Sequence, residues 1–255
     1  MTSTPVKFDL QWHDIWAAFS LLTRLPVPVD HARAGTRGAG SAWAFPVVGL
    51  VIGGGAGLLA MLAQKLGIPP TMAAISALAF LAIVTGGMHE DGLADFADGM
   101  GGSTLDRRLE IMKDSRIGAY GVIALVLAIL ARWSGIVELS GWAIVSVMAA
   151  VGATSRATMV FLMYSMHPAR KSGLSAGVGK PEVLTVLISA AIGLVSCVIL
   201  TGLSGIILFA LIYAGVLPVY WIANKSLGGQ TGDVLGAAQQ IAEITGLAAA
   251  IALLA

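Results

Sequence analysis

An acidic stretch in the first half of the chain has the residue types of a metal-binding or catalytic site. Between His89 and Asp98 the chain places one histidine and four carboxylates within ten residues. In a helix, Asp91, Asp95 and Asp98 stand at positions i, i+4 and i+7 and share one face. Like charges on one stripe repel unless a cation neutralises them, and oxygen ligands without a nearby cysteine favour a hard ion such as Mg²⁺ or Mn²⁺. The spacing therefore predicts a metal site.

A structural explanation of this stretch competes with the metal site. Two glycines precede it, and carboxylates just after a helix start are favoured by the helix dipole. That explanation covers Glu90 and Asp91. It leaves out Asp95 and Asp98, which lie further along the same face. We therefore prefer the metal interpretation.

The stretch from 106 to 116 follows directly and is basic. Arg107, Glu110 and Asp114 share a helical face, which also fits an exposed ion-pair ladder. Because the segment comes straight after the acidic helix, we expect the two to form an antiparallel hairpin. Basic side chains beside a metal–carboxylate site suit phosphate groups. The residues concerned are Arg107, Arg108, Lys113 and Arg116.

Polar groups elsewhere in the chain suggest further contributors. Arg156 lies inside an apolar run and is expected to face a polar cavity. The loop from 171 to 175, which holds Ser172, either wraps an anionic ligand or is a plain linker. Asp233 opens the last apolar run, either as an N-cap or as a ligand of metal or substrate. Glu243 lies about three turns deeper, where a charge needs a reason.

The composition is that of a membrane protein. The 255 residues are 57% hydrophobic and 11% charged, with a mean hydropathy of +0.86, whereas soluble domains carry about 25% charged residues. The net charge of +1 gives no reason to expect nucleic acid as a partner. The lone Cys197 excludes a disulfide framework, and the start of the chain does not have the pattern of a secretory signal. We expect one all-α integral-membrane domain over residues 1–255.

Apolar runs predict six or seven transmembrane helices, because a crossing needs about 20 apolar residues. A segment from Phe8 to Leu22 is too polar to span and predicts an amphipathic helix at the membrane interface, with its tryptophans at headgroup level. Glycines within the first run are interpreted as helix-packing positions. The runs are 42–64, 71–85, 117–137, 142–164, 183–200, 205–222 and 234–255, of which the second is short and the last holds Gln239, Gln240 and Glu243.

Basic residues predict the orientation. They gather before the first run and between the second and third, the fourth and fifth, and the sixth and seventh, whereas the alternate loops hold only Lys65 and Glu138. Positive loops stay in the cytoplasm. We therefore expect these loops, and with them the acidic stretch, on the cytoplasmic face of a bacterial inner membrane.

Several motifs together resemble the cobalamin synthase family, the adenosylcobinamide-GDP ribazoletransferases. The central run from Gly86 to Gly99 is long and unusual, so the match is specific. The resemblance covers nearly the whole chain and is weak only after Glu243. The other marks are Leu22–Pro28, Phe45–Leu50, Asp106-Arg107, Met112–Gly118, Thr231–Asp233 and Gly236-Ala237.

The resemblance implies a Mg²⁺-dependent transferase of vitamin B12 assembly. Adenosylcobinamide-GDP would react with alpha-ribazole or its 5′-phosphate, releasing GMP and giving adenosylcobalamin or its phosphate. The catalytic residues would be His89, Asp91 and Asp95, with His89 or a carboxylate as the general base. Metal ligands would come from Asp91, Asp95, Asp98, Asp114 and Asp233, and substrate contacts from Arg24, Arg108, Lys113, Arg116, Arg156 and Ser172.

Two other classes of protein compete with this interpretation. A phosphotransferase of the CDP-alcohol type requires Asp-Gly-x-x-Ala-Arg, but Asp91-Gly92 is followed by Leu93-Ala94-Asp95-Phe96, without the arginine. A cation transporter would place its ionisable groups near the middle of its spans, whereas most of them lie here in loops or at helix ends. The oligomeric state stays open, because the glycine-rich faces suit packing within or between chains.

Overall fold

The computed structural model describes residues 10–170 and 177–254. In those residues the regular structure is helical, apart from a single bridge between Pro168 and Gln230. The predicted all-α class is confirmed. The elements are α1 His13–Leu22, α2 His31–Arg37, the 3₁₀ helix η1 Gly38–Ala44, α3 Phe45–Lys65, α4 Pro70–Thr85, α5 Met88–Gly99, α6 Leu105–Ile111, α7 Ala119–Val137, α8 Gly141–Ser165, α10 Val183–Thr201, α11 Ser204–Leu227 and α12 Gly232–Leu254.

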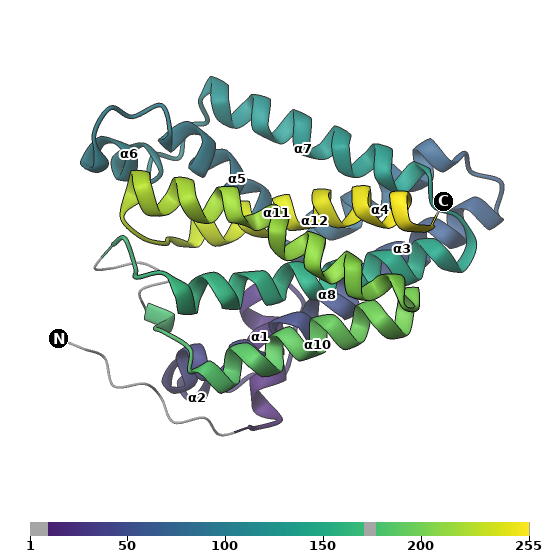
Figure 1. Ribbon diagram of the computed structural model, residues 1–255, viewed down its shortest axis with the longest axis horizontal. Helices are drawn as coiled ribbons and strands as arrows, with labels where there is room; N and C mark the ends of the chain where they lie inside the picture. Colours follow the sequence, from purple (N-terminus) through teal and green to yellow (C-terminus); the bar gives the residue numbers. More distant parts are fainter. Residues whose placement is uncertain (1–9, 171–176, 255) are drawn as a thin grey trace.

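The long helices form a polytopic membrane bundle. In the described residues six segments are long and apolar enough to cross a membrane. The first runs from α2 through η1 into α3, and the other five are α7, α8, α10, α11 and α12. Helices α4 and α5 pass the same test only as a pair, and they are bent by 88°. The prediction of six or seven spans is therefore confirmed. Figure 1 shows the long helices side by side, with α6 at one end and the end of α12 at the other.

Close packing of α3 against α8 forms the centre of the bundle. A Cβ at Gly49 would lie 1.9 Å from the carbonyl oxygen of Gly152, and one at Gly53 would lie 2.2 Å from that of Met148. Only glycine allows the two backbones to approach this closely. The expectation that the glycines of the first apolar run serve packing is confirmed.

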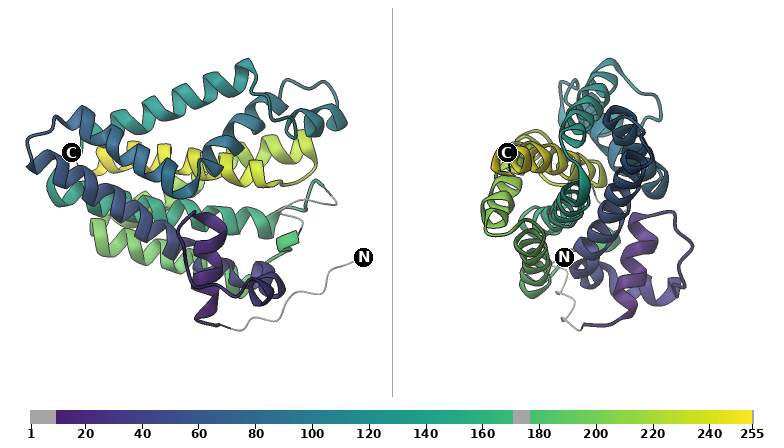
Figure 2. Two further views of the ribbon diagram at one scale, coloured as in Figure 1. Left: turned by 180° about the vertical axis from the view of Figure 1, so that it is seen from behind. Right: turned by 90° about the vertical axis from the view of Figure 1, so that its right-hand side faces the viewer.

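The N-terminal helix α1 lies crosswise to the spans (Figure 2). Buried Asp14 holds it in place, because its carboxylate accepts hydrogen bonds from the Arg37 guanidinium at 2.6 and 2.7 Å and from the Trp43 indole at 2.9 Å. Trp12 and Trp16 stay exposed. This arrangement agrees with the interfacial helix predicted from the sequence, except that the helix begins at His13 rather than at Phe8, which lies outside the described residues.

The segments that connect the helices at the α6 end contact one another, and we call this end the polar end. The Arg108 guanidinium donates to the carbonyl of Ser226 at 3.1 Å, and that of Arg170 donates to the carbonyl of Leu109 at 3.2 Å. The end of α11 and the segment after α8 therefore both lie beside α6, and the bridge from Pro168 to Gln230 brings the residues just before α12 to the same end. Three of the four predicted basic loops meet here in space.

Candidate active site

Two consecutive glycines turn the chain between α4 and α5. Gly86 and Gly87 have φ values of +69° and +68°, in the left-handed region that favours glycine. Arg24 packs on this turn: its backbone N–H donates to the carbonyl of Val84 at 2.7 Å. A Cβ at Gly86 would lie 2.5 Å from the Arg24 Nε. The turn therefore sets the direction of α5 and places a guanidinium at its start.

Helix α5 is pressed against the first turns of α12. A Cβ at Gly92 would lie 3.1 Å from the Cα of Asp233 and 3.2 Å from that of Gly236. A side chain at Gly92 would force the two helices apart. This contact brings the acidic helix next to Asp233, which is distant from it in sequence.

An open cleft of about 680 Å³ borders the acidic face of α5, and we call it the polar cleft. Asp91 and Asp95 line one side. Arg24, Lys113 and Asp114 line it as well. The structure thus brings together five of the residues predicted from the sequence, with both signs of charge around one opening.

The carboxylates raise one another's proton affinity. The pKa of Asp95 is raised from 3.8 to about 7 by partial burial and then by the charges of Asp91, Asp233 and Asp98. Asp95 lies on α5, outside the six straight spans, and is half-buried. In contrast, hydrogen bonds from Arg116 lower the pKa of exposed Asp114 to about 2. Acidic groups therefore converge around Asp95 without enough positive charge to offset them.

This group of carboxylates has the chemistry of a hard-cation site. Asp91, Asp95 and Asp233 offer only oxygen atoms, which Mg²⁺ prefers. Their effect on the pKa of Asp95 is the repulsion that a cation would relieve. Within residues 10–170 and 177–254, no three histidine, cysteine or acidic side chains already stand together as a metal-binding group. The oxygen donors of these three side chains are of the type that suits such an ion.

Asp98 turns away from the other two members of the acidic stripe. Its carboxylate accepts backbone hydrogen bonds from Gly118 at 2.7 Å and Gly121 at 2.8 Å. It therefore caps the first turn of α7, where a negative charge is favoured. Asp98 borders a neighbouring opening with Arg116 and not the polar cleft. The helical spacing placed it on the shared face, but α7 takes both of its oxygens.

Asp233 lies in the first turn of α12 and is not the residue that caps it. The Thr231 hydroxyl accepts the backbone N–H of Val234 at 3.3 Å, so the N-cap alternative for Asp233 is wrong. The Asp233 carboxylate accepts from the Thr231 hydroxyl at 3.2 Å and pairs with Arg170 at 3.4 Å. Sequence reasoning did not select Arg170 for the site, although it counted this residue among the basic loops.

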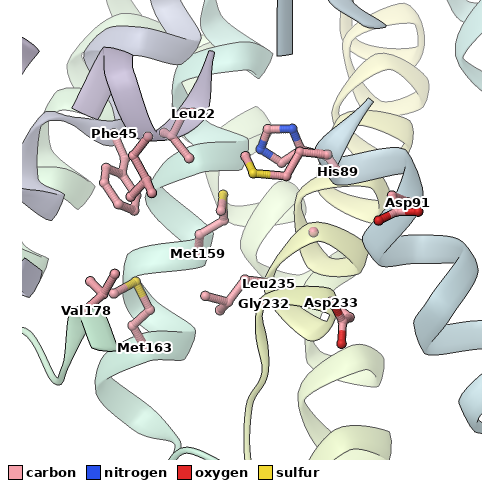
Figure 3. A pocket seen from close by; sticks show the side chains of 13 residues that line it. Leu22, Phe45, His89, Asp91, Met159, Met163, Val178, Gly232, Asp233 and Leu235 are labelled. Carbon is pink, nitrogen blue, oxygen red and sulfur yellow. The ribbon is translucent and has the colours of Figure 1, made fainter. Parts of the chain in front are cut away.

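An apolar cavity of about 190 Å³ lies on the other side of Asp91 (Figure 3). We call it the apolar cavity. His89 is 1% exposed and faces it, so the structure places this residue apart from the polar cleft. The role of general base stays a prediction for His89. The apolar side chains of the lining come from residues that the sequence did not assign to the site, namely Leu21, Leu22, Phe45, Met88, Met159, Met163, Val178 and Leu235.

Arg156 belongs to a buried ion-pair network rather than to either opening. Its guanidinium donates to Glu243 at 2.6 Å. Arg132 bridges Glu243 and Glu90, each at 3.1 Å, and Gln240 also donates to Glu90 at 3.2 Å. The network joins α5 to α7, α8 and α12. It supplies the reason for the charge of Glu243 inside the last span.

The remaining predicted contacts are spread over the polar end. Arg108 is partly buried against α11. Arg116 is exposed and pairs with Asp114 at 2.7 Å. The exposed ion pair of Arg107 with Glu110, at 2.8 Å, agrees with the ladder alternative for that part of α6. Ser172 lies outside the described residues.

Fold and site together define a class: a polytopic helical membrane protein with a polar cleft of carboxylates and basic groups at one end of the bundle. Comparison with known families narrows the class. The sequence model of the cobalamin-5-phosphate synthase family matches residues 14–251 of this chain. The chain therefore belongs to the cobalamin-5-phosphate synthase family, and the resemblance inferred from its motifs is confirmed.

Curated relatives match over nearly their whole length. An adenosylcobinamide-GDP ribazoletransferase from Bradyrhizobium diazoefficiens is 42% identical over 245 residues, covering 94% of this chain and 93% of the relative. One from Mesorhizobium japonicum is 40% identical, covering 91% and 90%. One from Shigella boydii is 36% identical, covering 92% and 97%. No solved structure shows significant similarity to the chain.

Proposed function

We propose that this protein transfers the adenosylcobinamide-phosphate group of adenosylcobinamide-GDP to alpha-ribazole or its 5′-phosphate, with release of GMP. Membership of the family and the names of its relatives support the reaction. One structural observation carries the proposal: Arg24 and Lys113 stand around the same open cleft as Asp91 and Asp95. Such a cleft suits a pyrophosphate, whose transfer depends mainly on positioning and on charge neutralisation.

The chemistry assigns a task to each side of the cleft. A ribose hydroxyl of ribazole attacks the corrinoid-side phosphorus, the bond to the GMP oxygen breaks, and the hydroxyl proton passes to a cleft carboxylate, for which Asp91 and Asp95 are the candidates. Arg24 and Lys113 neutralise the departing GMP. Mg²⁺, held by Asp91, Asp95 and Asp233, would supply charge stabilisation for the phosphoryl oxygens when bound.

The location follows from the basic loops. We propose a bacterial inner membrane with the polar end in the cytoplasm, because the loops that meet there carry most of the arginines and lysines. A fusion reporter attached to the loop between α6 and α7 should therefore report a cytoplasmic position.

The reaction is tested with purified protein, adenosylcobinamide-GDP, alpha-ribazole and Mg²⁺. We expect cobalamin and GMP from the wild type, and none from Asp91→Asn or Asp95→Asn, although both variants stay folded in the membrane. Asp106→Asn is the matched control, because Asp106 is exposed on α6 and borders neither opening. No product from the wild type, together with cation uptake into vesicles, would replace this proposal with a transporter.

A further inference from the structure

The apolar cavity lies among five elements that meet beside the polar cleft. Its walls include Leu22 from α1, Phe45 from α3, Met159 and Met163 from α8, and Leu235 from α12. Its volume is about 190 Å³, whereas an engineered cavity of about 150 Å³ lined by Leu, Ile and Phe binds benzene. The apolar cavity can therefore take one small planar aromatic group, and it is far too small for a corrinoid ring.

One polar group faces this cavity without a partner. The His89 Nε2 is buried and has no hydrogen-bond partner, and the residue is 1% exposed. Figure 3 shows the His89 imidazole turned toward Leu22 and Phe45 rather than toward Asp91. A buried polar atom left unpaired costs free energy. A ligand in the cavity with one complementary ring nitrogen would satisfy it.

Two carboxylates of the acidic group border the apolar cavity. Asp91 and Asp233 line the cavity, and Asp91 also lines the polar cleft. A ligand with its aromatic part inside would therefore place its remaining, polar part next to Asp91. That is where the attacking hydroxyl is needed.

We propose that the apolar cavity binds the dimethylbenzimidazole base of ribazole, with His89 hydrogen-bonded to the free ring nitrogen of that base. This inference rests on the proposed function. The base is planar and apolar apart from that nitrogen, and its two methyl groups would contact Met159 and Met163. The ribose then projects past Asp91 into the polar cleft, where adenosylcobinamide-GDP lies. His89 is thus a binding residue that sets the choice of base.

The guanine of adenosylcobinamide-GDP is the other planar base in the reaction. Its edge carries several donors and acceptors, each of which would need a partner in the cavity. Besides the imidazole of His89, the polar side chains that line the cavity are the carboxylates of Asp91 and Asp233. Burying guanine there would leave polar atoms unpaired, so the observations favour the less polar base.

The first test adds a side chain at Gly232, an exposed residue of the cavity lining. This residue lines the cavity, and a Cβ placed on it meets no atom within 4 Å, so a larger side chain there need not disturb the fold. We expect Gly232→Leu to raise the KM for alpha-ribazole by about tenfold or more while leaving the KM for adenosylcobinamide-GDP unchanged. The matched control is Gly35→Leu, because Gly35 is exposed on α2 and equally open, and it should change neither constant.

The second test addresses the hydrogen bond and requires no turnover. Wild-type protein in detergent should bind 5,6-dimethylbenzimidazole about threefold to tenfold more tightly than 5,6-dimethylindole, which lacks the free ring nitrogen. His89→Phe should bind the two probes equally. A preference for the benzimidazole that survives in His89→Phe would overturn the assignment of His89.

The outcomes separate this inference from the proposed function. If the wild type releases no GMP, the proposed function fails, whatever the probes bind. If the wild type is active but Gly232→Leu raises the KM for adenosylcobinamide-GDP instead, guanine occupies the cavity and the inference is overturned. Unchanged constants for both substrates in Gly232→Leu would also overturn it, because the cavity would then be empty during turnover.

Discussion

The buried ion-pair network makes the substitution Glu243→Gln a sharp test of the fold. The Glu243 side chain is 7% exposed, and those of Arg132 and Arg156 are 4% and 2% exposed. Its carboxylate accepts from Arg156 at 2.6 Å and from Arg132 at 3.1 Å. Glutamine keeps the size but removes the charge. Two guanidiniums would then be left with Glu90 as their only carboxylate partner among the described residues.

Removing one partner of a buried ion pair costs about 3–5 kcal/mol, because the other charge stays buried without compensation. A chain of this size loses about 2–4 °C in Tm per kcal/mol, so we expect the Tm of Glu243→Gln to fall by about 6–20 °C. Adding Arg156→Gln should restore part of the loss, since it removes the charge left unpaired. Activity should fall too, because Glu90 ties the acidic helix α5 to this network.

The control is Glu110→Gln, which removes the exposed partner of Arg107. The two side chains are 58% and 70% exposed, for Arg107 and Glu110 respectively. Such a pair is worth at most about 1 kcal/mol. The measurement is thermal unfolding of detergent-solubilised protein, followed by the loss of helical circular dichroism. Equal shifts in Tm for Glu243→Gln and Glu110→Gln would refute this reasoning. They would mean that the buried arginines do not depend on the charge of Glu243 for stability.

Two further predictions concern the bundle centre and the acidic helix. Gly49→Ala should prevent stable insertion because its methyl group would meet the Gly152 carbonyl, whereas Gly54→Ala, with its nearest neighbour at 3.5 Å, should be tolerated. The measurement is the amount of folded protein in the membrane for each variant. Equal amounts would contradict the close contact between α3 and α8. For Asp95, the folded pKa of about 7 exceeds the ordinary 3.8, so folded metal-free protein holds a proton that the unfolded chain has lost. The stability of the metal-free protein should therefore fall as pH rises from about 4 to about 7. Asp95→Asn should flatten the plot of Tm against pH in this range. Mg²⁺ should flatten it too, by binding the carboxylate of Asp95.

The sequence alone was enough for the fold class and for the family. Apolar runs long enough to cross a bilayer depend only on local composition, and the helices fall close to the predicted runs. The last run kept its span despite Gln239, Gln240 and Glu243, because buried arginines from other helices pair with its charge. The acidic stretch was also found from local spacing, since residues at i and i+4 meet on any helix.

Which of those acidic residues meet which partner was decided by the tertiary structure. Asp98 shares the helical face of Asp91 and Asp95, yet the start of α7 takes its carboxylate. Arg156 was expected at a polar cavity, and Glu243 on another helix pairs with it instead.

The apolar cavity is the clearest case of information absent from local patterns. Leu22, Phe45, Met159 and Leu235 come from four different helices, and each alone reads as an ordinary core residue. They surround an opening only because the double-glycine turn at Gly86 sets the direction of α5 and Gly92 lets it press against α12. Periodicity fixes which face of a helix is apolar, but the space between helices depends on how closely their backbones approach, and that is a property of the assembled bundle.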